Sequence, residues 1–196
     1  METKPNQNQS SGWSDIKAFA LDLVKILAIS LAIIIPFRLL VAEPFVVSGS
    51  SMVPNFHNKD YLIVDRISYR SREPQRGDVV VMKYPKDTSQ YFIKRIIGLP
   101  GEKVELKNGK VVIINGEYPQ GQELDEGYLP KNIATLGKPG PYTLGSGEYF
   151  VLGDNRTASS DSRVWGILPE DDIVGRAFLR AFPLGDFGLI KTPEYK

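Results

Sequence analysis

The sequence predicts a mainly β fold, in which a domain of antiparallel strands follows one membrane-spanning helix near the N-terminus. A long apolar run near the start of the chain predicts the helix, because it is long enough to cross a bilayer. Short apolar runs between turn-forming residues predict the strands, which we expect to form a coiled antiparallel sheet. The chain has 196 residues, enough for one domain and an appendage.

The predicted organisation has three parts: a disordered tail over residues 1–16, a transmembrane helix over 17–42 and a β-rich domain over 43–196. Residues 23–40 would extend about 27 Å as a helix, close to the roughly 30 Å hydrocarbon core of a bilayer. A buried core helix and a cleaved signal peptide are the alternatives. The run has no polar face in its middle and no clear A-x-A cleavage site after it, so a retained span is favoured.

The β-rich domain is predicted from apolar runs bounded by Gly, Pro or Asp. Asn108-Gly109 is typical of a type I′ hairpin turn, since both residues adopt positive φ readily. The stretch 117–147 is rich in Gly and Pro and predicts long loops over a sheet, and 170–174 predicts a short helical turn. The expected strands are Val79–Met82, Tyr91–Ile97 and Glu148–Leu152.

The composition excludes several classes of function. Charge is nearly balanced, with 24 Lys and Arg against 23 Asp and Glu, which argues against nucleic acid as a partner. There is no cysteine and one histidine, His57, so thiol catalysis and the usual zinc sites are excluded. We therefore expect no metal ion and no cofactor.

A candidate nucleophile and a candidate base remain. The segment Ser48–Pro54 (SGSSMVP) lies directly after the span; by itself it could be a simple turn. In the strand that follows later, side chains alternate, so Lys94 shares a face with Phe92 and Ile96. Burial among apolar neighbours lowers the pKa of a lysine and makes its amine a usable base. Without cysteine, a Ser–Lys pair is the simplest nucleophile and base.

A third segment, 153–166 (GDNRTASSDSRVWG), packs small and charged residues together. The charged residues are expected to pair within the loop, which is the commoner structural use of such residues. A hydroxyl such as that of Ser159 could instead orient a buried amine by accepting a hydrogen bond from it.

Taken in order, these segments resemble type I signal peptidases, the membrane-bound serine proteases that remove signal peptides from exported preproteins. The resemblance runs from the span to about Ala177. Its motifs are G-S-S-M-V-P at 49–54, R-G-D-V-V-V at 76–81, Y-F-I-K-R-I-I-G-L-P-G at 91–101, G-D-N-R at 153–156 and S-D-S-R-V-W-G at 160–166.

The resemblance implies roles for particular residues. Ser51 matches the family nucleophile, whose backbone N–H would donate to the oxyanion, and Lys94 matches the general base. Ser159 falls where the family keeps a hydroxyl that holds the lysine, and Asp161 and Arg163 match an ion pair that supports the site. The residues Phe45, Val47, Met52 and Ile93 fall where the family lines small pockets for the −1 and −3 residues of an Ala-x-Ala-like site.

The resemblance also implies partners and a location. The substrate would be the signal peptide of a preprotein, bound as an added strand, and the lipid bilayer would hold the span. The membrane would be the plasma membrane, or the thylakoid membrane of a photosynthetic bacterium, with the catalytic domain on the extracytoplasmic or lumenal side.

Some features depart from the family pattern. Some members carry a serine two residues before the nucleophile, where this chain has Gly49, so a second oxyanion donor is either backbone, Ser50 or absent. Ala158 stands where other members have asparagine, and residues 102–147 should form a reduced version of the second β domain. The alternatives are a non-catalytic, membrane-tethered β scaffold and a Ser–Lys protease with another substrate, such as a self-cleaving repressor.

Overall fold

The structure is a computed structural model that describes residues 11–40, 42–138, 140–193 and 195. The chain divides into two compact units, with the boundary between residues 41 and 42. The first unit contains α1 (Ser11–Leu40), and the second contains all the strands. A mainly antiparallel β fold with one N-terminal apolar helix is thus confirmed.

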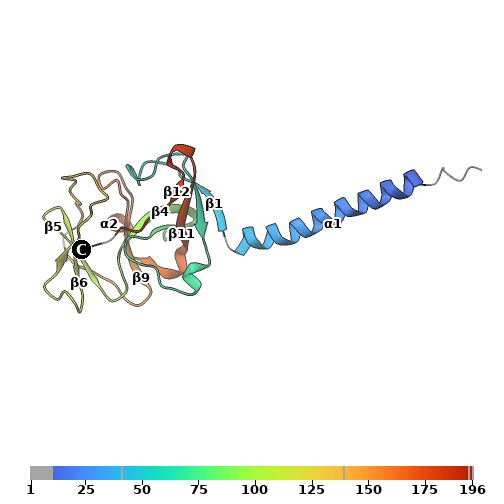
Figure 1. Ribbon diagram of the computed structural model, residues 1–196. Helices are drawn as coiled ribbons and strands as arrows, with labels where there is room; N and C mark the ends of the chain where they lie inside the picture. Colours follow the sequence, from blue (N-terminus) through green and yellow to red (C-terminus); the bar gives the residue numbers. More distant parts are fainter. Residues whose placement is uncertain (1–10, 41, 139, 194, 196) are drawn as a thin grey trace, which may run out of the picture. The chain divides into compact units, whose positions relative to one another are not determined.

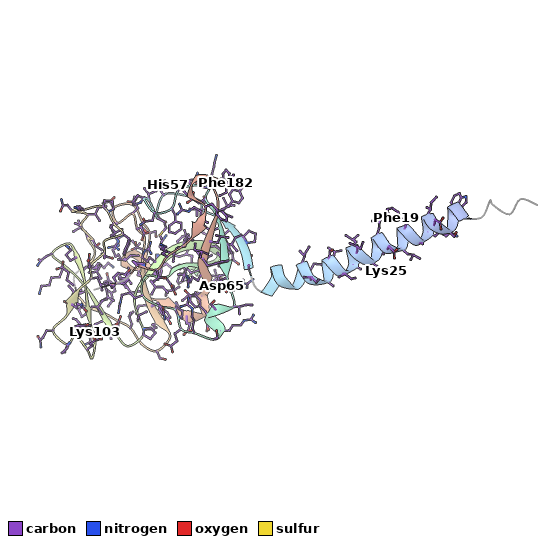
Figure 2. The ribbon with its side chains drawn as sticks, viewed as in Figure 1. Phe19, Lys25, His57, Asp65, Lys103 and Phe182 are labelled. Carbon is purple, nitrogen blue, oxygen red and sulfur yellow. The ribbon has the colours of Figure 1, made fainter. Side chains whose placement is uncertain are left out.

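Helix α1 is long and apolar enough between Gly12 and Ile35 to cross a membrane, judged by its length and composition. Its described apolar side chains project outward, as Phe19 does with 66% of its surface exposed (Figure 2). A helix that is apolar on all sides needs an apolar surrounding, which a bilayer provides. The helix begins at Ser11, so it includes part of the expected tail, whose residues 1–10 lie outside the described residues.

The second unit contains two antiparallel sheets (Figure 1). The larger sheet has the strand order β1-β2-β11-β3-β4-β9-β10, and β12 pairs with β11. Its strands are β1 (Ala42–Val46), β2 (Tyr61–Asp65), β3 (Val79–Tyr84), β4 (Asp87–Gly98), β9 (Glu148–Leu152), β10 (Leu168–Pro169), β11 (Ile173–Phe182) and β12 (Gly188–Leu189). The smaller sheet has the order β7-β6-β5-β8, from β7 (Gln122–Glu123), β6 (Lys110–Ile114), β5 (Lys103–Lys107) and β8 (Tyr142–Thr143).

Short helices connect some of the strands. They are α2 (Ser162–Trp165), η1 (Ser68–Arg70), η2 (Glu170–Asp172) and η3 (Leu184–Asp186). The expected helical turn at 170–174 corresponds to η2, and the stretch expected to be loops, 117–147, contains the two-residue strands β7 and β8. The Asn108-Gly109 turn joins β5 to β6 with φ values of 53° and 77°, as a type I′ turn requires.

Alternation along the central strands builds three apolar clusters. In β9, Tyr149 and Val151 enter the cluster around Trp165, while Phe150 and Leu152 face the cluster beneath the smaller sheet. The third cluster lies next to the Ser48–Pro54 segment and comprises Val47, Met52, Phe56, Leu62, Val79 and Ala177. The sheet therefore supports the candidate nucleophile segment through this buried apolar cluster.

Strand β11 was not among the strands expected from the sequence. Its ten residues, IVGRAFLRAF, lie between β2 and β3 in the middle of the larger sheet. Its register against β2 shifts between Ala177 and Leu179 and again between Arg180 and Phe182. These irregularities break the period of two, so an alternating pattern does not reveal the strand.

Candidate active site

Ser51 lies in a turn that is held from two sides. On the side of the larger sheet, Val47 exchanges backbone hydrogen bonds with the segment before β2: its N–H donates to the Asp60 carbonyl and its carbonyl accepts from Lys59 N–H. On the other side, the Asn155 backbone N–H donates to the Ser51 carbonyl over 2.9 Å, and its side-chain amide donates to the Ser50 carbonyl over 3.1 Å. The position of the turn is therefore determined by the nearby segment before β2 and by Asn155, which is distant in sequence.

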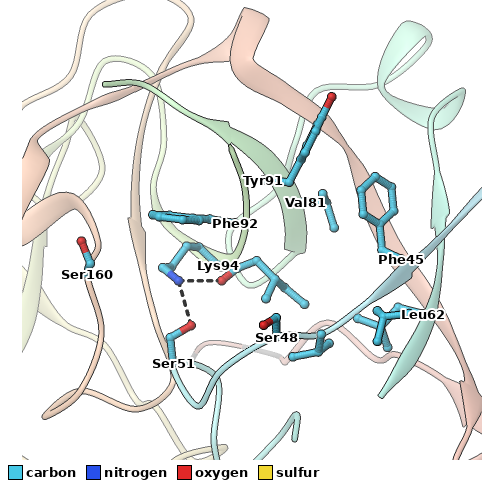
Figure 3. A pocket seen from close by; sticks show the side chains of 12 residues that line it. Phe45, Ser48, Ser51, Leu62, Val81, Tyr91, Phe92, Lys94 and Ser160 are labelled. Carbon is cyan, nitrogen blue, oxygen red and sulfur yellow. Dashed lines mark hydrogen bonds between the residues drawn. The ribbon is translucent and has the colours of Figure 1, made fainter. Parts of the chain in front are cut away.

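Lys94 reaches this turn from β4. Its Nζ donates to Ser51 Oγ over 2.9 Å and to the Ile93 carbonyl oxygen over 2.9 Å (Figure 3). The lysine is only 3% exposed, and its Nζ lies 5.3 Å from the centre of the Phe92 ring. The structure thus brings together the serine and the lysine that the sequence singled out, with the apolar neighbour that strand alternation predicts.

The surroundings of Lys94 lower its pKa to about 8. Burial is the main cause, because it disfavours the charged ammonium; the carboxylates of Asp161 and Asp154 act in the opposite direction. About a tenth of such amines are neutral at pH 7, against roughly one in 2,500 for an exposed lysine. This is the property that a lysine needs in order to act as a general base.

Asp161 and Arg163 form a bidentate ion pair with two contacts of 2.8 Å. The same carboxylate accepts the Gly153 backbone N–H over 3.0 Å. Although burial opposes the charged form, these donors hold the pKa of Asp161 below its usual range. The pair fastens the two ends of the 153–163 loop beside Lys94, so the expected ion pairing within this loop is present for Asp161 and Arg163. The other two charged residues of the loop pair outside it, Asp154 with Arg95 and Arg156 with Glu126.

Arg95 and Asp154 form a second buried pair that sequence patterns did not assign. Arg95 Nε and Nη2 donate to the two carboxylate oxygens of Asp154 over 2.8 and 2.6 Å. Both side chains are almost fully buried, and the carboxylate holds the pKa of Arg95 above its usual value despite burial. The pair joins β4 to the loop that carries Asn155.

Gly153 lies where the loop and the Ser51 turn meet. A Cβ at this position would lie 2.5 Å from the Ser51 carbonyl oxygen and would overlap the Ser159 side chain. Only glycine allows the two segments to approach this closely.

The hydroxyl of Ser159 does not accept a hydrogen bond from Lys94 in this structure, contrary to the expected contact. Its Oγ lies against Gly153 and near the Asp161 carboxylate, whose pKa it helps to lower. Among the described residues it has no hydrogen bond of normal geometry. The amine is oriented instead by Ser51 and the Ile93 carbonyl.

A pocket of about 240 Å³ opens beside Ser51 and Lys94 (Figure 3). Three of the four residues expected to line it do so: Phe45, Val47 and Ile93. Met52 is the exception, because it is 1% exposed and packs in the apolar cluster beneath the turn. Further lining residues that the sequence did not indicate are Val46, Ser48, Leu62, Val81, Tyr91, Phe92 and Ser160.

The turn before the nucleophile follows from Gly49, which has φ +95° and whose N–H donates to the Asn58 side chain over 3.1 Å. In the described part of the chain, the Ser51 N–H donates to no protein acceptor, so it is free to bind an oxygen of a substrate. Ser50 is one candidate for the second oxyanion donor, and it does not line the pocket, whereas Ser48 does.

Comparison with known proteins identifies the family. Residues 20–182 match the family described as "Signal peptidase, peptidase S26". The chain belongs to this signal peptidase family. The prediction of a peptidase from this family is therefore confirmed.

Two relatives that align in sequence support the assignment over most of the chain. The chain is 37% identical to "Probable signal peptidase I-1" and 39% identical to "Probable signal peptidase I-2", both of Synechocystis sp.. These alignments cover 91% and 87% of this chain, and 88% and 77% of the relatives. A crystal structure of a signal peptidase I from Enterococcus faecalis is 32% identical and superposes with a TM-score of 0.44, covering 54% of this chain and 97% of that one.

Proposed function

We propose that the chain is a membrane-bound serine endopeptidase that removes N-terminal signal peptides from exported preproteins by cleaving after an Ala-x-Ala-like site. Ser51 is the nucleophile and Lys94 is the general base. The observation that carries this proposal is the 2.9 Å contact between a buried amine and a serine hydroxyl at the edge of a small apolar pocket. The names of the relatives, which are signal peptidases, support the same substrate class.

The reaction begins with neutral Lys94, which accepts the Ser51 proton as Oγ attacks the carbonyl carbon of the scissile peptide bond. The carbonyl oxygen becomes an oxyanion, to which the Ser51 N–H donates. The Lys94 ammonium then gives its proton to the leaving amine, the C–N bond breaks, and an ester to Ser51 remains. Water, deprotonated by Lys94, attacks the ester, and the proton returns to Ser51.

The supporting residues act on the loop rather than on the substrate. Asp161 accepts both Arg163 and the Gly153 N–H, which keeps the loop beside the Ser51 turn. Catalysis requires the serine and the amine within hydrogen-bond reach, and a loop held at both ends maintains that distance. Asp161 and Arg163 are therefore assigned supporting roles, and Ser159 is assigned one through the Asp161 carboxylate that it lies near.

The substrate binds as an extended peptide between β1 and β4. β1 is the last strand at one edge of the larger sheet, and the pairs of β4 with β9 cover only its part from Arg95 to Gly98. In the described structure, β1 and residues 87–94 of β4 thus each present an unpaired edge beside the pocket. A peptide can add to such edges by backbone hydrogen bonds, while its −1 and −3 side chains enter the pocket.

Helix α1 anchors the enzyme as a single span in the bilayer, with the β domain on the extracytoplasmic or lumenal side. The membrane is the plasma membrane, or the thylakoid membrane if the source is photosynthetic. A tethered protease meets signal peptides in the plane of the membrane in which they are inserted, which raises their effective concentration.

The alternative is a non-catalytic, membrane-tethered scaffold. A scaffold has no use for a lysine that is 3% exposed and pairs directly with no carboxylate in the described structure, because burial of an ammonium is unfavourable. The buried Lys94 therefore favours the enzyme.

The test is cleavage of a preprotein with an Ala-x-Ala signal by the detergent-purified full chain, with Ser51→Ala and the exposed-site control Ser71→Ala. We expect the parent and Ser71→Ala to cut after the second alanine, and Ser51→Ala to leave the preprotein intact. If the folded parent does not cut, or if folded Ser51→Ala cuts as fast as the parent, the proposal is overturned.

A further inference from the structure

After β11 and η3, the chain forms a strap, which we define as residues 188–193 and Tyr195. The strap begins as β12, which pairs with β11 (Figure 1). The next residue, Ile190, donates its N–H to the Phe178 carbonyl over 2.8 Å and packs against the apolar cluster that contains Met52. The strap therefore touches the core directly beneath the Ser51 turn.

The strap then crosses closely over Gly77. A Cβ at Gly77 would lie 2.9 Å from the Tyr195 ring and 3.0 Å from both Pro193 and Thr192. The Thr192 hydroxyl donates to the buried carboxylate of Asp78 over 2.8 Å. The carbonyl of Gly77 accepts a hydrogen bond of 2.9 Å from Arg95 Nη1, so this crossing lies next to the Arg95 side chain.

The last described residue of the strap extends a stack of side chains. The Tyr195 ring meets the Tyr128 ring edge-on, with the ring centres 6.2 Å apart and the planes at 85°. The Arg95 guanidinium lies 4.3 Å from the centre of the Tyr128 ring and pairs with Asp154. Asn55 closes the group by donating to both the Tyr128 carbonyl and the Asp154 carboxylate, over 3.1 and 2.9 Å.

A cavity of about 570 Å³ separates part of the strap from this stack. It is lined on the side of the domain by Asn55, Phe56, Arg95, Tyr128 and Arg180, by Asp186 and Phe187 before the strap, and by the strap residues Gly188, Leu189, Ile190, Lys191 and Pro193. The strap is consequently fastened at separate points instead of through a continuous packed interface. Loss of one fastening can therefore loosen it without unfolding the sheet.

We propose that the strap is a positioning element of the active site. By enclosing Arg95 against Tyr128, it holds Asp154 in place. Asp154 is followed in the chain by Asn155, whose N–H donates to the Ser51 carbonyl, so the strap keeps the Ser51 turn in register with Lys94. Thr192 and Tyr195 act through these residues and do not touch the substrate. The inference rests on the proposed function.

A loosened strap should change the protonation of Lys94. The groups that face its amine are the Ser51 hydroxyl, the Phe92 ring and, at longer range, the carboxylates of Asp161 and Asp154. If the loop opens, water reaches the amine and removes the burial that is the main cause of its low pKa. The carboxylates of Asp161 and Asp154 then lie farther away, which acts in the opposite direction but is the smaller effect, so the pKa of Lys94 should rise.

The experiment compares Tyr195→Ala with the conservative variant Tyr195→Phe and with Leu184→Ala, an exposed residue outside the strap. For each full-length protein, kcat/KM is measured from pH 6 to 10.5, and amide hydrogen exchange is measured over residues 50–56 and 153–156. A rise of about one unit in the pKa of Lys94 lowers kcat/KM about tenfold at pH 7. At high pH, where the amine is neutral again, kcat/KM returns to the parental value. We expect this shift and faster exchange in Tyr195→Ala alone.

A parental pH profile and parental exchange in Tyr195→Ala would overturn the positioning role, as would the same change in Leu184→Ala. A uniform loss of activity at all pH values, without faster exchange, would also contradict it and would indicate a loss of folded protein. Exchange needs no turnover. If the parent cleaves nothing, the proposed function fails, while exchange still decides whether the strap holds the Ser51 turn.

Discussion

Lys94 and Arg95 are neighbours in β4, yet only the Arg95 side chain is paired with a carboxylate. Lys94 donates to the uncharged Ser51 hydroxyl, whereas Arg95 is paired at both carboxylate oxygens with Asp154. Side chains alternate along a strand, so one residue faces the candidate nucleophile and the next faces the loop that holds it. Burial without a direct ion pair lowers the pKa of Lys94, while its neighbour keeps a stable charge.

The rate of cleavage should increase with pH through the pKa of Lys94. The neutral amine is the active form and that pKa is about 8, so kcat/KM should rise about tenfold per pH unit below 8 and level off above it. A profile of kcat/KM from pH 5.5 to 10 measures this. A rate that stays constant from pH 6 to 8 would contradict Lys94 as the base.

Lys94→Met should abolish turnover and also remove a pH-dependent part of the stability. The folded pKa lies below the unfolded value of 10.5, so the unfolded chain binds more protons between about pH 8 and 10.5, and unfolding becomes less favourable as pH rises through that window. Relative to the variant, the parent should gain up to about 3 kcal/mol of unfolding free energy there. Denaturant titrations at pH 7 and 10 give this difference; an equal change in both proteins would refute the buried, neutralised lysine.

Gly153→Ala should reduce both stability and activity. The added methyl would contact the Ser51 carbonyl and Ser159, and overpacking of this kind costs about 1–3 kcal/mol. Gly116→Ala is the matched control, because nothing lies within 4 Å of a Cβ at that position. Thermal unfolding and peptide cleavage of both variants test the contact, and equal behaviour of the two would exclude it.

Met52→Ala should lower stability without changing substrate preference. Met52 packs in the core instead of lining the pocket, and truncation of a buried methionine costs about 2–5 kcal/mol. Cleavage rates for peptides that carry Ala, Ser or Val at −1 should keep the parental order. A changed order would show that Met52 contacts the substrate side chain and lines the pocket.

Tyr91→Ala should widen the range of residues accepted at −3. The Tyr91 and Phe45 rings lie 5.8 Å apart, come from opposite walls and line the pocket at the end away from Ser51 (Figure 3). The kcat/KM ratio of a Leu(−3) to an Ala(−3) peptide should rise about tenfold, which corresponds to about 1.4 kcal/mol. Tyr91→Phe keeps the ring and should keep the parental ratio; an unchanged ratio in Tyr91→Ala would show that the ring sets no size limit.

Local patterns in the sequence predicted the elements whose form depends on neighbouring residues. The apolar run of α1, strands β3, β4 and β9, and the Asn108-Gly109 turn all follow from periodicity or from the φ preferences of single residues. The roles of Ser51 and Lys94 came from residue chemistry and from the family resemblance, since no periodic pattern relates two residues 43 positions apart.

The remaining features depended on long-range contacts. Strand β11 carries bulges that hide its alternation, and Ser159 turns toward Gly153 and Asp161 because the loop folds back on itself. Met52 follows Ser51 directly, and the family resemblance placed both residues at the pocket. Side-chain directions in a turn have no fixed period, so no local pattern could separate the directions of the two side chains. Only packing in the folded domain decided that Ser51 faces Lys94 and Met52 faces the core.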